Sequence, residues 1–100
     1  MNNKIFTLAE IQALVTPIAK RYGVDRMWIF GSYARGEATS KSDIDFRVDC
    51  DAIHGYFRFA GFYSDLEDVL AKRIDLLTTA QIDDDKFLEN ISKDEVMIYE

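Results

Sequence analysis

The chain has 100 residues, a length that excludes a two-domain enzyme. Of these residues 48% are hydrophobic and 13% aromatic, which suffices for one compact core. Lys and Arg total 12 against 18 Asp and Glu, and the resulting net charge of −6 argues against nonspecific binding to nucleic acid. No apolar run approaches the roughly 20 residues that cross a bilayer, and the first residues contain no apolar secretory signal. We therefore expect one domain over residues 1–100 with no membrane or direct nucleic-acid partner, and the single cysteine, Cys50, fits a cytoplasmic protein.

A helix is predicted near the start of the chain. Apolar residues recur at helical spacing from Thr7 to Tyr22, and Thr7 with Glu10 forms the capping-box pattern that marks a helix N-terminus. Pro17 lies inside this segment and removes an amide donor, so we expect it to kink the helix or split it in two.

Two strands separated by a polar stretch follow this helix. Val24–Phe30 is a short apolar run between glycines, which is typical of a buried strand. Residues 31–42 are rich in polar and turn-forming residues. Residues 43–49 alternate between charged and apolar side chains, which predicts a half-buried strand.

The second half of the chain predicts a long helix, a strand, a short helix and a terminal extended segment. The long helix runs from Phe57 to the basic pair Lys72-Arg73, which suits a helix C-terminus. Ile74–Thr78 has the composition of a strand, Asp84–Ser92 has helical spacing, and Val96–Tyr99 favours extended structure. The expected order is therefore α, β, turn, β, α, β, α, with an extended end.

The residues best suited to chemistry lie around the predicted second strand. Residues two apart on a strand share a face, so Asp43 and Asp45 would place their carboxylates side by side and repel each other unless a cation lies between them. Hard oxygen ligands favour Mg²⁺, which also takes substrate phosphate oxygens as ligands. Upstream, Gly31 ends a buried strand and Ser32 would cap a short helix whose backbone amides can receive phosphates. This combination indicates a site for a metal-bound nucleoside triphosphate.

Each motif taken alone also has a structural explanation. An Asp-x-Asp at a strand start can be turn chemistry, and Gly-Ser after a strand can be an ordinary helix start. Arg35 either adds positive charge near the phosphates or makes a structural salt bridge. Asp75, a polar residue in a later strand, requires no function when considered alone.

The combined pattern resembles a known family. Gly31-Ser32, ten intervening residues and Asp43-x-Asp45 match the signature of the polymerase-β-like nucleotidyltransferases. The fuller form, Gly-Ser-x-Ala-Arg-Gly with Ser-Asp-Ile-Asp-Phe, is similar to the minimal stand-alone branch, the minimal nucleotidyltransferases (MNT), which includes the antitoxins of HEPN/MNT toxin–antitoxin systems. The segment around Asp75 resembles the strand that carries the family's third carboxylate.

This resemblance implies an α/β (α+β) fold in which a small mixed β-sheet is flanked by helices. By the same resemblance Asp43 and Asp45 are the catalytic residues and bind two Mg²⁺ ions, and Asp75 helps to hold the ion that activates the attacking hydroxyl. Gly31 and Ser32 would contact the phosphates, with Arg35 nearby.

The resemblance also implies an activity and a partner. The chain would be an antitoxin that transfers AMP from ATP to a tyrosine of a HEPN ribonuclease toxin, forming a hetero-oligomer with it. Two alternatives remain at this stage: a non-catalytic antitoxin that covers its partner stoichiometrically, and an enzyme that modifies a small molecule.

Three further features call for interpretation. Tyr56 and Phe57 exceed what the core of the long helix needs, so we expect a patch that faces a partner or stacks on a base. Arg47 occupies a position where an aliphatic residue is expected, and it would pair with Asp45 or Asp49. His54 is the single histidine of the chain and falls in a predicted loop, so we interpret it as a surface residue rather than a zinc ligand.

Overall fold

The computed structural model describes residues 3–53, 55–82 and 84–100, so His54 lies outside the described residues. In chain order the elements are α1 (Leu8–Tyr22), β1 (Arg26–Phe30), α2 (Gly31–Ala34), β2 (Ile44–Asp49), α3 (Tyr56–Leu70), β3 (Ile74–Thr78), the 3₁₀ turn η1 (Thr79–Gln81), α4 (Asp85–Ser92) and β4 (Val96–Tyr99). This order agrees with the predicted one. Among the helices described, none is both long and apolar enough to cross a bilayer.

The strands form a single mixed sheet of four strands in the order β3-β2-β1-β4. β1 pairs antiparallel with both β2 and β4, whereas β2 and β3 are parallel. The α3 helix connects the two parallel strands, as a parallel crossover requires. The C-terminal segment that the sequence predicted to be extended is thus an edge strand.

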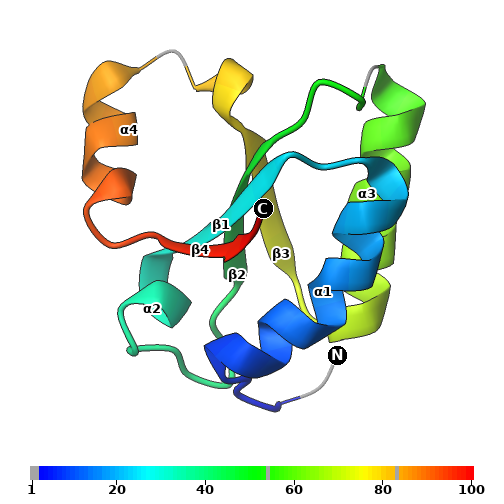
Figure 1. Ribbon diagram of the computed structural model, residues 1–100. Helices are drawn as coiled ribbons and strands as arrows, with labels where there is room; N and C mark the ends of the chain where they lie inside the picture. Colours follow the sequence, from blue (N-terminus) through cyan, green and yellow to red (C-terminus); the bar gives the residue numbers. More distant parts are fainter. Residues whose placement is uncertain (1–2, 54, 83) are drawn as a thin grey trace.

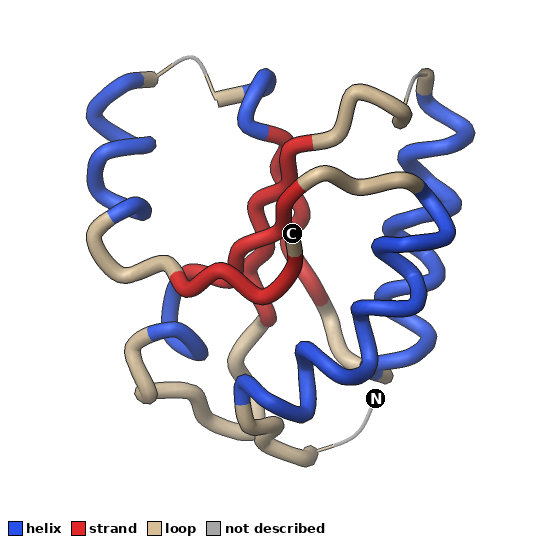
Figure 2. Tube along the Cα trace, in the orientation of Figure 1, coloured by secondary structure: helices blue, strands red, loops and turns tan. Residues whose placement is uncertain are grey.

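The helices cover the two faces of the sheet unequally. α1 and α3 lie side by side against one face, whereas α2 and α4 lie on the other side of the sheet (Figure 1). The tube view shows the strands between these two groups of helices (Figure 2). We call the face away from α1 and α3 the open face.

The core lies between the sheet and the pair α1 and α3. Along β2 the residues that face it are the apolar ones of the alternation, Ile44, Phe46 and Val48, and all three are fully buried. Phe62 and Leu66 of α3 are equally buried opposite them. Because side chains alternate along a strand, Asp45 and Arg47 must lie on the open face.

The α1 helix is continuous despite Pro17. Thr7 and Glu10 form the predicted capping box, with the Glu10 amide donating to Thr7 Oγ1 at 3.1 Å. Pro17 does not split the helix, because the buried residues Val15 and Ile18 on either side of it pack into the same core. Tertiary packing therefore outweighs the loss of one amide donor.

Arg47 is buried on the open face, with 7% of its surface exposed. Its guanidinium donates to both carboxylate oxygens of Glu95, at 2.6 and 2.9 Å, and to Thr79 Oγ1 at 2.7 Å. It also stacks over the ring of Trp28 at 3.7 Å. The expected pairing with Asp49 is present but longer, at 3.9 Å, and the dominant partner is Glu95.

This geometry predicts that Glu95→Leu destabilises the fold by about 3 kcal/mol, because it leaves the buried guanidinium of Arg47 without its main counter-charge. The matched control is Glu37→Leu, which breaks an exposed pair with Arg35 and is expected to cost less than about 1 kcal/mol. Urea unfolding of both variants measures the difference. Equal losses would show that Glu95 does not anchor Arg47.

Candidate active site

The site is built on the open face where β2 and β3 begin. Asp45 lies opposite Asp75 in the parallel register of β2 and β3, and opposite Phe30 in the antiparallel register of β1 and β2. Cross-strand neighbours point to the same face, so the two carboxylates are adjacent. Asp45 is half-buried and Asp75 is exposed.

Asp43 belongs to the loop that enters β2 rather than to the strand itself, which corrects the sequence-based placement. A tight turn fixes this loop: the Ser42 amide donates to the Thr39 carbonyl at 3.1 Å, and the Thr39 amide donates to Ser42 Oγ at 2.9 Å. The charge of Asp43 is nevertheless felt at Asp45, where it raises the carboxyl pKa. The loop therefore brings the third carboxylate to the same site.

Lys72 supports the loop that carries Asp43, a contact that the sequence did not predict. It is 3% exposed, and its ammonium donates to the Ser40 carbonyl at 3.2 Å. The sequence pattern predicts only that Lys72 is a basic residue at a helix end. No local pattern indicates that its side chain reaches a loop 32 residues away.

Gly31 begins α2 and packs directly against Asp45. Its φ is +75°, and a Cβ added there would lie 2.1 Å from Asp45 Oδ2. Only glycine combines this backbone conformation with so close an approach. Ser32 does not cap α2, which corrects the prediction: the N-cap position is Phe30, and no side chain caps the helix.

Burial and charge repulsion both act on Asp45. Burial is the largest effect that raises its carboxyl pKa, to about 7, followed by a hydrogen bond with Asp75 and repulsion by Asp75 and Asp43. The positive charge of Arg35 opposes this shift. Arg35 also makes an exposed salt bridge, with Nε 3.3 Å from Glu37 Oε2. Arg35 thus makes a salt bridge and also lowers the pKa of Asp45.

The donor set suits Mg²⁺ held together with substrate. Among the described residues, no three Asp, Glu, His or Cys side chains are arranged to enclose a metal ion by themselves. Mg²⁺ seldom needs such a cage, since it binds one or two carboxylates and completes its shell with waters and substrate phosphates. The repulsion that Asp45 experiences is the kind that a divalent cation relieves.

Comparison with known proteins identifies the family. Residues 13–100 match the family model described as polymerase beta, nucleotidyltransferase. The chain belongs to this nucleotidyltransferase family. The protein adenylyltransferase MntA of Thermococcus cleftensis is 35% identical over 82 residues, which cover 78% of this chain and 83% of the relative.

Two solved structures share the fold of this nucleotidyltransferase. A toxin–antitoxin structure with AMP-PNP has a TM-score of 0.75 at 16% identity and covers 88% of this chain and 72% of that one. The tri-AMPylated HEPN toxin of Shewanella oneidensis in complex with its MNT antitoxin gives a TM-score of 0.70 at 13% identity, covering 92% and 71%. The mixed sheet with flanking helices is therefore the nucleotidyltransferase fold, as expected.

The raised pKa of Asp45 predicts that this nucleotidyltransferase is more stable when that carboxylate is removed. Because the folded pKa, about 7, lies above the unfolded value, ionisation weakens the fold as the pH rises through 7. Asp45→Asn is expected to stabilise the metal-free protein by about 1–2 kcal/mol at pH 8, a value discounted for solvent screening, and by little at pH 4. Urea unfolding with EDTA at both pH values measures this, and a less stable variant at pH 8 would contradict it.

The exposed aromatic pair lies far from the carboxylates. Tyr56 and Phe57 are 78% and 89% exposed, which confirms that they are not core residues. They begin α3, at the end of the sheet opposite α2 (Figure 1). This position argues against stacking on the base of a nucleotide held at Asp45. Contact with a partner stays a prediction.

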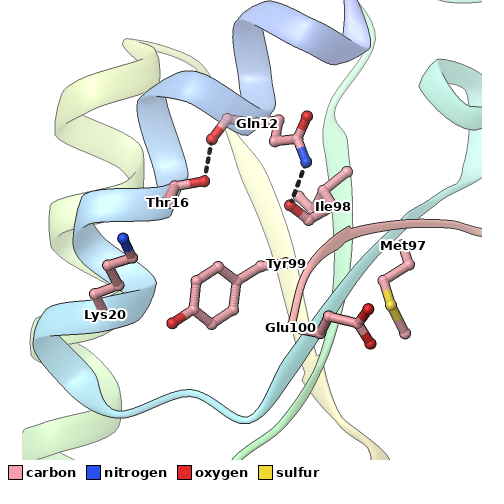
Figure 3. A pocket seen from close by; sticks show the side chains of 7 residues that line it. All are labelled: Gln12, Thr16, Lys20, Met97, Ile98, Tyr99 and Glu100. Atoms are coloured by element: carbon pink, nitrogen blue, oxygen red, sulfur yellow. Dashed lines mark hydrogen bonds between the residues drawn. The ribbon is translucent and has the colours of Figure 1, made fainter.

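A separate hollow lies between α1 and β4. It has a volume of about 450 Å³, and the side chains of Gln12, Thr16 and Lys20 line its α1 side (Figure 3). The Gln12 amide donates to the Ile98 carbonyl at 3.0 Å and ties the edge strand to α1. None of the predicted site residues lines this hollow, so it is distinct from the carboxylate site.

Proposed function

We propose that this nucleotidyltransferase is an antitoxin that transfers AMP from Mg-ATP to a tyrosine of a HEPN ribonuclease toxin and thereby neutralises it. The observation that carries the proposal is the pairing of Asp45 with Asp75 across parallel strands, with Asp43 at the entrance of β2. The relative that supports this assignment is named a protein adenylyltransferase. The setting is proposed to be the cytoplasm.

The residues take the following roles in this proposal. Asp43 and Asp45 would hold two Mg²⁺ ions, with Asp75 as a further ligand to one of them. The metals would neutralise charge on the phosphates and acidify the attacking hydroxyl. Gly31 and Ser32 place the α2 backbone beside the phosphates, and Arg35 adds a positive charge that already acts on Asp45.

The reaction is an in-line displacement at the α-phosphorus of ATP. The tyrosine oxygen forms a bond to that phosphorus, and the bond from the phosphorus to the bridging oxygen of the β-phosphate breaks. Pyrophosphate leaves with the bonding electrons. The hydroxyl proton passes to solvent past Asp75, the exposed carboxylate of the site.

The acceptor is proposed to be held largely by the partner. In this proposal the domain over residues 1–100 supplies the carboxylates and the phosphate contacts, and the partner supplies the acceptor tyrosine. Structures of the same fold include a complex with an AMPylated HEPN toxin, which supports a hetero-oligomer in which the toxin presents its own tyrosine.

Neutralisation at low antitoxin concentration tests the proposal. The purified HEPN protein is incubated with ATP, Mg²⁺ and one-twentieth of a molar equivalent of this chain, the chain is then removed, and ribonuclease activity is measured. We expect near-complete and lasting inhibition, because a catalyst turns over. Inhibition that needs one equivalent and disappears on removal would instead support an antitoxin that acts by binding. ATP consumption with an added small-molecule acceptor and no protein partner would support the third alternative.

A further inference from the structure

The α4 helix presents an apolar face that the domain itself does not bury. Phe87, Leu88 and Ile91 fall on one side of the helix by their spacing, yet no residue of α4 is buried. Phe87 is 41% exposed, and none of the three belongs to the core cluster. An amphipathic helix with an uncovered apolar side is typical of an interaction surface.

One row of the sheet next to α4 also carries apolar side chains on the open face, on either side of the buried Arg47. The registers place Leu77, Arg47, Trp28 and Met97 in one row across all four strands. Met97 is 40% exposed, and Trp28 is half-buried. In Figure 3, Met97 lies on the far side of β4 from Thr16 and Lys20, whereas the Tyr99 ring reaches toward α1.

This row is one step along the strands from the catalytic carboxylates. Arg47 is two residues after Asp45 and Leu77 is two residues after Asp75, so the two rows are about 7 Å apart on the same face. A molecule that lies on the Trp28 row is therefore placed beside Asp45.

Arg47 ties both connections of α4 to this face. Through Thr79 it holds η1, which precedes α4, and through Glu95 it holds the segment that follows α4. The Glu95 amide in turn donates to the Ile91 carbonyl at 3.1 Å. The helix is thus fixed beside the sheet while its side chains stay uncovered.

The charge around α4 favours one class of occupant. The segment from Asp84 to Asp94 carries four acidic and two basic side chains, and Glu95 is already paired with Arg47. This excess repels the phosphates of a nucleotide and attracts a basic polypeptide. A peptide also matches a surface that extends from the carboxylates to the edge strand, which is longer than one nucleotide base.

We propose that the apolar face of α4, with Trp28 and Met97, is the docking surface for the basic and apolar segment of the protein partner that carries the acceptor hydroxyl. This inference rests on the proposed function. It assigns to α4 the contacts with the partner that bring the acceptor to the carboxylates.

The test uses the full chain with Phe87→Ser and Ile91→Ser, two substitutions at positions that are not buried. The control is Val69→Ser, which removes an exposed apolar side chain from α3, on the opposite face of the sheet from α4. Affinity for the purified HEPN protein and for ATP is measured by calorimetry, and the KM for the HEPN protein by AMP incorporation.

We expect the α4 variant to lose at least tenfold in affinity for the HEPN protein and to raise its KM by a similar factor, with ATP affinity unchanged. The double variant Asp85→Lys, Glu89→Lys should also bind the HEPN protein less tightly, and its loss of affinity should be larger at low salt than at high salt. Unchanged HEPN affinity in the α4 variant would overturn the inference while leaving the proposed function intact. A loss of ATP affinity would show that α4 covers the nucleotide and would also overturn it. If the wild-type chain neither binds nor modifies the HEPN protein, both proposals are wrong.

Discussion

Replacing Gly31 by alanine is expected to destabilise the fold by about 3 kcal/mol and to abolish nucleotidyl transfer. The added methyl would lie 2.1 Å from Asp45 Oδ2, so the Asp45 carboxylate or the start of α2 must move. The positive φ of +75° adds backbone strain for any residue with a Cβ. Urea unfolding and an assay of AMP transfer measure the two effects.

Gly36→Ala is the matched control for this prediction. Gly36 has nearly the same φ, +73°, but apart from its chain neighbours no atom of the described residues lies within 4 Å of an added Cβ. It therefore reports the backbone strain alone, expected to be about 1 kcal/mol, with transfer activity retained. If Gly36→Ala and Gly31→Ala lost equal stability and equal activity, the contact with Asp45 would have no role.

The double variant Asp43→Asn, Asp45→Asn is expected to lose at least about a thousandfold in AMP transfer, because the metals that these residues are proposed to hold would supply several kcal/mol of transition-state stabilisation. The fold should persist, since neither side chain lies in the core and removing Asp45 relieves repulsion. The proposed complex with the HEPN protein should also persist, because the proposed docking surface on α4 does not include Asp43 or Asp45. The assay compares single-turnover rates with saturating ATP and Mg²⁺.

Asp49→Asn is the control for the loss of charge from the same strand. Asp49 ends β2 on the open face and pairs with the partly exposed Arg26 at 3.2 Å. It lies four residues after Asp45, at the other end of the strand. We expect its substitution to change the transfer rate by less than about threefold, because an exposed pair contributes little to the local field. A large loss of transfer rate would mean that the overall negative charge of the strand, rather than specific metal contacts, supports the activity.

The sequence predicted most of the elements because they depend on local periodicity. The capping box at Thr7 and the alternation along residues 43–49 are short-range patterns, and both are present in the structure. The site was predictable for a related reason. Gly31 and Asp45 are close in the sequence, so the two residues that meet in the site belong to one compact sequence motif.

The contacts that the sequence did not predict join distant segments. The main partner of Arg47 is Glu95, 48 residues away, and no local pattern favours it over the neighbouring Asp49. Pro17 is accommodated because the core holds both halves of α1. Lys72 reaches the loop of Asp43 because the starts of β2 and β3 are hydrogen-bonded neighbours. Each of these depends on the sheet order, which no local pattern contains.

The most direct test of the account is the intact mass of the HEPN protein after incubation with this chain, ATP and Mg²⁺. We predict a gain of one or more AMP masses on a HEPN tyrosine, absent when the chain carries Asp43→Asn and Asp45→Asn. An unchanged HEPN mass, with a stable complex formed by both versions of the chain, would contradict the proposed adenylyltransferase activity.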